Sequence, residues 1–422
     1  MSVLTEKHIL LGVTGSIAAY KSADLASKLT QAGTLVDVIL SGSGEKFISP
    51  LTFQSITGRR AYTDQDLWGN EAHVLHVGLG HSANLLVIAP CTANTLAKLA
   101  HGAADNLLTV TALAAQCPIV IAPAMDGGMF EAPATQENLR TLKKRGFTVI
   151  GPAEGHLASG LSGKGRMIEP PEIIGYIRLV LGRKGKLAGK KVVVTAGGTQ
   201  EALDPVRVIT NRSSGKQGYA LAQAALDAGA EVCLITSQTS LIPPVGARVV
   251  DVLSAQDMLE AVQNETAEAL IMAAAAADFR PKHTARDKLK KRDGPPQVEL
   301  EAVPDILKTV AGSGSRKKRY RITVGFAAES RDLIENATQK LKSKGLDLIA
   351  ANDISARDSG FTVDTNRVTL LFADGTRENL PLMSKPEVAE KIIDITARLL
   401  ESACASWSCP ISMQTTPHWK RY

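Results

Sequence analysis

The chain has 422 residues, of which 44% are hydrophobic and 21% charged, so we expect a globular protein of two or three domains rather than a disordered chain or a single small module. No run approaches the roughly 18 consecutive apolar residues of a membrane span, and no signal peptide precedes the first apolar run, which predicts a cytoplasmic protein that does not bind a membrane. The net charge of +6 is spread over several clusters and only 4% of residues are aromatic, so we do not expect a nucleic acid as partner.

The first domain is predicted to be α/β and to begin with a βαβ unit. A helix is predicted over 17–31, ending at the Ala-Gly pair before the second strand. Buried strands are predicted by the apolar runs 9–13, 36–40, 85–89 and 119–122. Runs that are apolar throughout are typical of parallel strands covered on both faces. We therefore predict a doubly wound domain over residues 1–181.

A second α/β domain is predicted over residues 191–402. It follows a segment, 182–190, rich in basic residues and glycine, a composition typical of a linker. Strands are predicted at 191–195, 232–236, 269–273 and 323–326, with a late hairpin of 368–372 and 377–380. The polar, unperiodic segment 403–422 is expected to be a disordered tail.

Four polar turns follow strands or helices of the first domain. Small residues and the Ser16 hydroxyl lie where the first strand meets a helix, and Ser41 follows the next strand. Thr92 and Asn94 follow the third strand. The carboxyl ends of parallel strands meet at one edge of a sheet, where ligands bind, so these turns favour a cofactor pocket over four unrelated turns. The pattern lacks G-x-G-x-x-G, which disfavours a nicotinamide dinucleotide.

The order of these motifs resembles the flavin-containing cysteine decarboxylases, which form homo-oligomers. The motifs are residues 15–21, 50–54, 89–95, 105–109 and 123–129. The resemblance implies a flavodoxin-like domain that binds FMN, with the phosphate near Ser16 and Ser41 and the ring near Thr92, Ala93 and Asn94. It also implies a catalytic role for His76 and substrate contacts from Met129 and Arg166.

Two positions depart from the common pattern of these decarboxylases. Asp126 stands where relatives usually carry Asn, and an ionised carboxylate would repel the substrate carboxylate unless it is protonated or turned away. Ser159 stands where relatives usually carry a Cys that donates a proton, and a hydroxyl is a far weaker acid than a thiol. Both remain candidate catalytic residues. The alternative is a flavin-binding first half that no longer decarboxylates.

The second domain carries a polar segment at residues 204–218 before a helix. It combines hydroxyls, a glycine, the Asn211 carboxamide and several cations, a set that favours binding of a phosphate or an acyl phosphate. It does not match the Walker pattern. Lys288 lies in a later basic segment, and composition alone leaves open whether it clamps a triphosphate or belongs to a solvated loop.

From about residue 189 to 400 the order of motifs resembles phosphopantothenate–cysteine ligases. The resemblance implies that Asn211 acts on an acyl-cytidylate intermediate, that Arg207 and Ala274 bind substrate, and that Mg2+ accompanies the nucleotide. It implies contacts to CTP from Asp278, Lys288, Pro304, Asp305, Ile306, Leu307, Phe326, Lys340 and Lys344.

The two resemblances together cover about 390 residues and point to the family of bifunctional coenzyme A biosynthesis proteins. The implied sequence of reactions is ligation of 4'-phosphopantothenate to cysteine with CTP, followed by decarboxylation of phosphopantothenoylcysteine to phosphopantetheine with FMN. The second reaction uses the product of the first. A homo-oligomer is expected.

Overall fold

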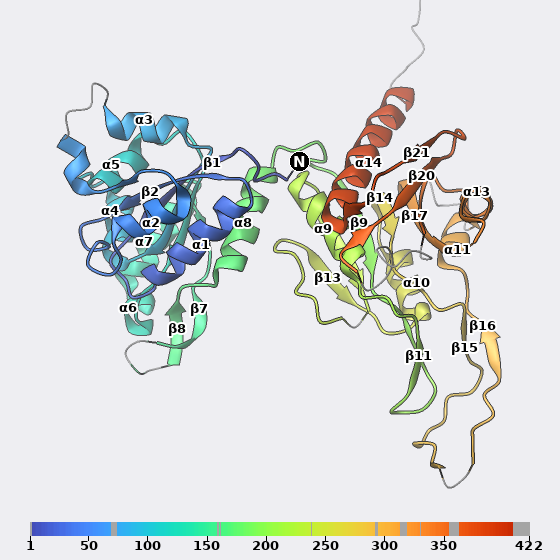
Figure 1. Cartoon of the computed structure of the whole chain (residues 1–422). Helices are drawn as coiled ribbons and strands as arrows, with labels where there is room; N and C mark the ends of the chain where they lie inside the picture. The colour runs from blue at the N-terminus through green and yellow to red at the C-terminus, as the bar shows by residue number, and fades with distance from the viewer. Residues whose placement is uncertain are drawn as a thin grey trace, which may run out of the picture. The chain divides into compact units, whose positions relative to one another are not determined.

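The computed structural model describes residues 2–68, 74–157, 160, 162–237, 239–291, 294–312, 319–329, 331–353 and 363–407. The chain divides into two compact units. The first comprises Met1–Gly185 with the short segments Leu226–Ala228 and Pro244–Gly246, and the second comprises the remainder (Figure 1). Among the described helices, none combines the length and the apolar character that crossing a membrane requires.

A parallel sheet of six strands in the order β3-β2-β1-β4-β5-β6 forms the centre of the first unit. Its strands are β1 (His8–Val13), β2 (Leu35–Leu40), β3 (Ala61–Tyr62), β4 (Leu85–Cys91), β5 (Ile119–Pro123) and β6 (Thr148–Val149). This is the Rossmann order, and without the short β3 it is the flavodoxin order. The strand order reverses between β1 and β4, which opens a crevice at their carboxyl ends.

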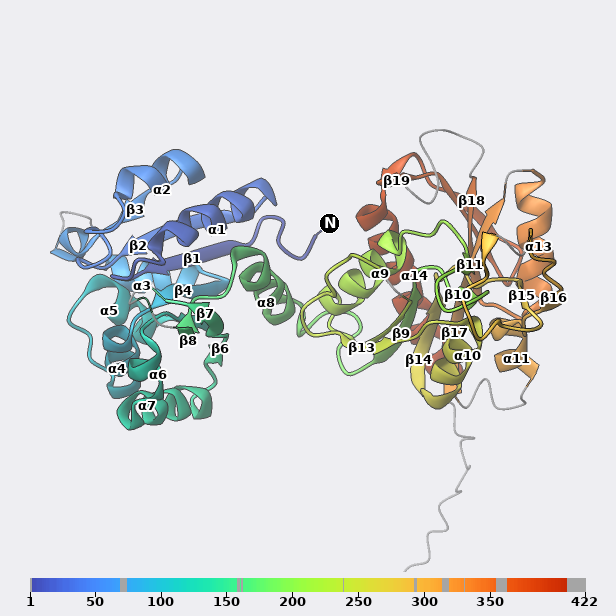
Figure 2. The same cartoon turned by 90° about the horizontal axis from the view of Figure 1, so that it is seen from below.

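Helices cover both faces of this sheet (Figure 2). One face carries α1 (Ala19–Gln31), α2 (Pro50–Thr57) and α8 (Pro170–Gly182), and the other carries α3 (Leu75–Ser82), α4 (Ala93–His101), α5 (Leu107–Ala114) and α7 (Pro133–Lys144). Side chains alternate along a strand, so Ile9 and Leu11 enter the core beneath α1 while Leu10 enters the core beneath α4. Burial on both faces explains why these strands are apolar throughout.

The second unit has an eight-stranded sheet in the order β13-β12-β9-β14-β17-β18-β20-β21. Its strands are β9 (Lys191–Ala196), β12 (Glu231–Thr236), β13 (Arg248–Asp251), β14 (Ala267–Met272), β17 (Tyr320–Glu329), β18 (Leu348–Asp353), β20 (Val368–Phe372) and β21 (Arg377–Asn379). The first six in this order are parallel, and β20 and β21 form the predicted antiparallel hairpin. The prediction of two doubly wound α/β domains is confirmed.

Helices and short ladders complete the second unit. The helices are α9 (Lys216–Asp227), α10 (Ala255–Asn264), α11 (Ile306–Gly312), α13 (Leu333–Ser343) and α14 (Lys385–Trp407). The ladders pair β10 (Gln200–Ala202) with β11 (Val208–Thr210), β15 (Phe279–Pro281) with β16 (Leu300–Ala302), and β19 (Thr365–Asn366) with β22 (Met383–Ser384). Met258 of α10, Ile306 of α11 and Leu341 of α13 share one core with the sheet.

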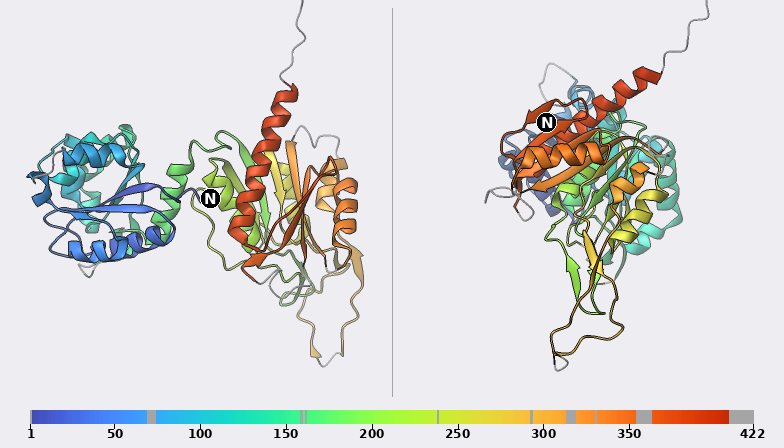
Figure 3. Two further views of the ribbon diagram at one scale, coloured as in Figure 1. Left: turned by 45° about the horizontal axis from the view of Figure 1, so that its top comes forward. Right: turned by 90° about the vertical axis from the view of Figure 1, so that its right-hand side faces the viewer.

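The long helix α14 runs along the second sheet and extends beyond the predicted end of the domain (Figure 3). The sequence placed that end at 402, but α14 continues to Trp407, so residues 403–407 are helical and were wrongly assigned to the tail. The physical reason is that no glycine or proline interrupts the helix between Pro386 and Pro410. The rest of the predicted tail, 408–422, lies outside the described residues.

Candidate functional site

A cavity of about 840 Å³ opens at the carboxyl edge of the first sheet. This volume lies within the range of small-molecule sites. The turns after β1, β2, β4 and β5 line it, together with the hairpin of β7 (Ala153–His156) and β8 (Ser162–Arg166). Of the predicted site residues, the cavity brings together Ser16, Ser41, Thr92, Ala93, Asn94, Asp126, Met129 and Arg166.

The turns after β1 and β2 touch each other at glycine. A Cβ on Gly15 would lie 2.4 Å from the Cβ of Ser43, and one on Gly44 would lie 2.6 Å from the carbonyl oxygen of Val13. Both distances are too short for any side chain, so the close approach of the two turns requires glycine. The Ser16 hydroxyl accepts a hydrogen bond from the Ala18 amide at 3.2 Å. Because α1 begins at Ala19, the start of a 13-residue helix faces this cavity and favours an anion there.

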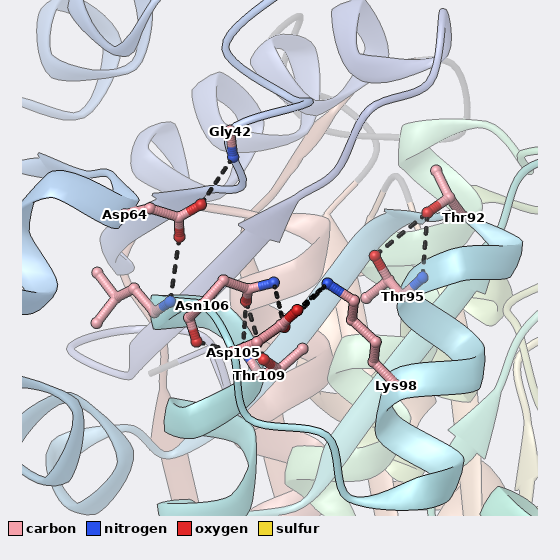
Figure 4. Close-up of polar contacts among 9 residues, drawn as sticks. Gly42, Asp64, Thr92, Thr95, Lys98, Asp105, Asn106 and Thr109 are labelled. Atoms are coloured by element: carbon pink, nitrogen blue, oxygen red, sulfur yellow. Dashed lines mark hydrogen bonds and ion pairs between the residues drawn. The ribbon is translucent and has the colours of Figure 1, made fainter.

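Asp64 joins two walls of this cavity, as Figure 4 shows. One of its carboxylate oxygens accepts the Gly42 amide at 3.0 Å and the other accepts the Leu107 amide at 3.1 Å. The carboxylate therefore fixes the turn after β2 against the start of α5. The sequence analysis did not single out Asp64, because it lies in a short 3-10 helix (Asp64–Trp68) and its partners are distant in the chain.

The loops before α4 and α5 are held by side-chain caps (Figure 4). The Thr92 hydroxyl caps α4 by accepting the Thr95 amide at 3.3 Å, and Asn106 caps α5 by accepting the Thr109 amide at 2.9 Å. Lys98 forms an ion pair of 2.7 Å with Asp105. The hydrogen bond from Lys98 holds the pKa of the Asp105 carboxyl below its ordinary value. These caps place hydroxyl and amide groups along one wall of the cavity.

Asp126 begins the short helix α6 (Gly127–Glu131). Its carboxylate accepts the Gly128 amide at 3.0 Å, so this oxygen is turned toward the helix backbone. Asn and Asp serve equally well at such a position, which gives a structural reason why Asp is tolerated here. The Met125 amide donates to the Gly165 carbonyl at 3.0 Å and so fixes the base of the β7–β8 hairpin beside Asp126.

Arg166 and Lys21 share one carboxylate at the base of the hairpin. Glu169 accepts from Arg166 at 2.7 Å and from Lys21 at 2.8 Å, and Lys21 is 4% exposed. The hydrogen bond from Lys21 lowers the pKa of the Glu169 carboxyl. Glu169 thus holds the guanidinium that the sequence predicts to bind substrate.

His76, Ser159 and His156 are the candidate proton donors of the first unit, and they differ in their position relative to the cavity. His76 is half-buried in α3 and is not among the described residues that line the cavity. Ser159 lies outside the described residues. His156, at the end of β7, does line the cavity, although the sequence analysis did not select it.

A second cavity, of about 300 Å³, lies in the second unit. It brings together the predicted residues Asn211, Ala274, Asp278, Pro304, Asp305, Ile306, Leu307, Phe326, Lys340 and Lys344. The Asn211 amide nitrogen donates to the carbonyls of Ala275 at 3.2 Å and Ala276 at 3.1 Å, which fixes the carboxamide at the end of β14. The side chain of Ile306 is buried in the core. Only the backbone of Ile306, at the start of α11, can therefore contact a ligand.

Two lysines of this cavity form ion pairs with carboxylates. Lys340 lies 2.6 Å from Glu329, and Lys344 lies 2.9 Å from Asp305. Burial raises the pKa of the Asp305 carboxyl, but the hydrogen bond from Lys344 and other polar contacts outweigh this effect and keep that pKa below its ordinary value. Each lysine is therefore held by a carboxylate at the wall of the cavity.

Two predicted residues, Lys288 and Arg207, are not among the described residues that line the second cavity. Arg207 pairs with Asp204 at 2.6 Å and donates to the Leu289 carbonyl at 3.1 Å, so it anchors the backbone next to Lys288, whose side chain is exposed. Within the part of the chain that the structure describes, no group of three or more His, Cys, Asp or Glu residues is arranged to hold a metal ion.

The second cavity is also lined by polar residues that were not predicted individually as site residues. They include Lys216 and Gln217, from the predicted polar segment 204–218, and Asn352, Asn366 and Lys385. Asn366 lies in a two-residue strand and Lys385 is the first residue of α14, so neither belongs to a recognisable pattern. A buried Lys at a helix start cannot be told from a solvated one by sequence.

Comparison with known proteins gives two family matches. The family described as "Flavoprotein" matches residues 2–182, and "DNA/pantothenate metabolism flavoprotein C-terminal domain" matches residues 187–399. The chain is 45% identical over 402 residues to "Coenzyme A biosynthesis bifunctional protein CoaBC" of Bacillus subtilis (strain 168), covering 94% of this chain and 98% of that protein.

Two further similar proteins were found. The protein of the same name from Vibrio cholerae serotype O1 is 42% identical over 399 residues, covering 94% of this chain and 99% of that protein. The crystal structure of the C-terminal domain of a CoaBC protein is 41% identical, covers 52% of this chain and 99% of that domain, and has a TM-score of 0.43.

Proposed function

Because the chain belongs to the family of bifunctional coenzyme A biosynthesis proteins, we propose that its second unit ligates 4'-phosphopantothenate to cysteine with CTP and that its first unit decarboxylates the product with FMN. The predicted combination of a flavoprotein decarboxylase half with a ligase half is confirmed at the level of the family. The alternative of a first half that no longer decarboxylates finds no support in these matches.

The observation that carries the flavin proposal is the glycine-lined cradle of the first cavity. Gly15 and Gly44 let two turns meet where no Cβ fits, and the start of α1 lies beside the Ser16 and Ser41 hydroxyls. These groups fit a phosphate, and Thr92, Ala93 and Asn94 would flank the ring. When bound, FMN supplies the reversible oxidation of the substrate thiol, which places a C=S group beside the carboxylated carbon as an electron sink.

The residues of the chain then bind the substrate and move a proton. Arg166 offers a cation to the substrate carboxylate, while Asp126 keeps one oxygen bonded to the Gly128 amide. After CO2 leaves, an acid must protonate the substrate carbon. His156 lines this cavity, and an imidazole can serve as a general acid.

We propose that His76 acts in a cavity completed by a second copy of the chain. Its own cavity does not include it among the described lining residues. In a homo-oligomer, a face bearing α3 of one copy would approach the cavity of another. In the proposed homo-oligomer, one copy of the chain would therefore supply His76 to the decarboxylase cavity of another.

For the ligase half, the carboxylate of phosphopantothenate must first become a better acyl donor. We assign formation of an acyl-cytidylate to the second cavity, where Lys340 and Lys344 provide positive charge and Asn211 is fixed at the end of β14. Cations beside a triphosphate offset the charge that develops on leaving pyrophosphate. Mg2+ is proposed to arrive bound to the phosphates of CTP, because Mg2+ in such sites is usually bound through substrate phosphates.

Two measurements test this function. Denatured protein should release FMN at one molecule per chain, identified by chromatography and mass; release of FAD or of no flavin contradicts the proposal for the first half. Incubation with phosphopantothenate, cysteine and each nucleotide should give phosphopantothenoylcysteine and then phosphopantetheine by mass, most rapidly with CTP. Absence of CO2 from phosphopantothenoylcysteine contradicts the decarboxylase assignment.

A further inference from the structure

Four residues that line the ligase cavity form a connected cluster outside the proposed CTP contacts. They are Lys216, Gln217, Asn366 and Lys385, here called the Asn366 cluster. The Asn366 amide nitrogen donates to the Gln217 side-chain oxygen at 2.8 Å, and Gln217 donates to the Lys385 carbonyl at 3.2 Å. Three elements, α9, β19 and α14, thus contribute to one polar wall.

The Asn366 side-chain oxygen is a buried acceptor that no hydrogen bond reaches. Asn366 is 3% exposed. Within the described part of the chain, the Thr111 hydroxyl is the only other buried side-chain polar atom that has no hydrogen-bond partner. Buried polar atoms are nearly always bonded, so each exception indicates a missing partner. Asn366 lines the cavity, but solvent does not reach its side-chain oxygen in this structure, so a ligand N–H or O–H can supply the partner once the neighbouring side chains shift.

Two cations lie beside this acceptor. Lys216 pairs with Asp364 at 2.6 Å, and the Asp364 carbonyl accepts the Lys385 amide at 2.9 Å. Lys385 is 4% exposed, and its burial lowers the pKa of its ammonium, with nearby Lys216 lowering it further. An anion bound here would favour the charged form of both lysines.

A ligand that fits this wall needs a hydrogen-bond donor close to an anionic group. CTP and phosphopantothenate also combine N–H or O–H donors with anionic groups, but in an amino acid the amine and the carboxylate are attached to one carbon, which matches an acceptor and cations on one wall. Resting on the proposed function, we propose that the Asn366 cluster is the cysteine subsite of the ligase. The substrate carboxylate binds Lys385 and Lys216, and the amine donates to the Asn366 oxygen.

This placement also suits the reaction. Positive charge near an amine favours its neutral, nucleophilic form. The nitrogen lone pair forms the C–N bond to the acyl carbon as the C–O bond to CMP breaks, and the amine gives up one proton to solvent.

The first test separates the two half-reactions. Pyrophosphate release from CTP and phosphopantothenate without cysteine measures acyl-cytidylate formation alone. We expect Asn366→Leu and Lys385→Gln to leave this release near the wild-type rate and to raise the KM for cysteine by about tenfold, the loss of one charge-assisted hydrogen bond. Lys391→Gln, an exposed lysine on the same helix, is the matched control and should change neither quantity.

The second test compares two substrates. Cysteamine lacks the carboxylate, so the wild type should use it with a KM about tenfold or more above that for cysteine, and Lys385→Gln should remove most of this preference. A wild-type ratio near one overturns the proposal. So do variants that raise the KM for phosphopantothenate or CTP instead, which would assign the cluster to a phosphate group. A wild type that releases no pyrophosphate overturns the proposed ligase function itself, and this inference with it.

Discussion

Asp126 shows how one side chain can satisfy the fold and alter the chemistry. Its carboxylate caps α6, a task that Asn performs equally well, so Asp126→Asn should change the free energy of unfolding by less than about 0.5 kcal/mol. The amide removes a negative charge from the cavity, and we expect a lower KM for phosphopantothenoylcysteine. Steady-state kinetics with thermal unfolding checks both. A higher KM would show that the carboxylate itself helps to bind substrate.

Two substitutions can identify which group donates the proton in the decarboxylase. His156→Gln should slow formation of phosphopantetheine, because it removes the imidazole that lines the cavity, and Ser159→Cys in that background should restore the rate by supplying a thiol. His101→Gln, exposed at the end of α4, is the control. If neither substitution changes product formation in single-turnover measurements, water delivers the proton.

Asn211 has an exposed side chain, although its amide donates to two carbonyls after β14, so its role can be tested with the fold retained. Asn211→Asp replaces a donor with a carboxylate that would repel those carbonyls and the acyl phosphate. We expect near-normal CTP binding by calorimetry and turnover reduced by about 100-fold, as is usual when one donor to a reacting centre is removed. A wild-type rate contradicts its assignment to the acyl centre.

At the scale of elements, the turn between β1 and α1 depends on a glycine that the sequence marks only weakly. Gly15→Ala places a Cβ 2.4 Å from that of Ser43, which forces the two turns apart and costs about 1–3 kcal/mol as overpacking does. We expect the purified variant to lose most of its FMN absorbance and some thermal stability in the first unit, with ligase rates unchanged. Gly78→Ala is the control, because nothing lies within 4 Å of its added Cβ. Full FMN content in Gly15→Ala would contradict the proposal that the close contact of the two turns at Gly15 is needed to bind FMN.

The elements also show what sequence can and cannot predict. Strands buried on both faces are apolar throughout, so β1, β4 and β9 were predicted within a few residues. Hydroxyl and amide residues directly after those strands were predicted to line cavities because a parallel sheet brings its carboxyl ends together. Asp64 and Asn366 come instead from short elements placed by distant partners, which no local pattern records.

At the scale of the whole molecule, the two activities should be separable because each unit has its own cavity. His76→Asn should abolish decarboxylation and leave pyrophosphate release with CTP unchanged. Since His76 is not among the described residues lining its own cavity, the lost activity should be recoverable from another copy of the chain.

Co-expression of His76→Asn with Gly15→Ala, each with its own affinity tag, provides that test. A cavity intact in the His76→Asn chain can receive His76 from a Gly15→Ala chain. Random mixing composes about a quarter of the sites correctly, and selection through both tags raises that share, so the isolated mixed oligomers should recover about a quarter to a half of the wild-type decarboxylation. Each variant alone should remain inactive in decarboxylation while keeping full ligase activity, which shows that both chains fold. Mixed oligomers that form but yield no phosphopantetheine would contradict a site shared between two copies of the chain.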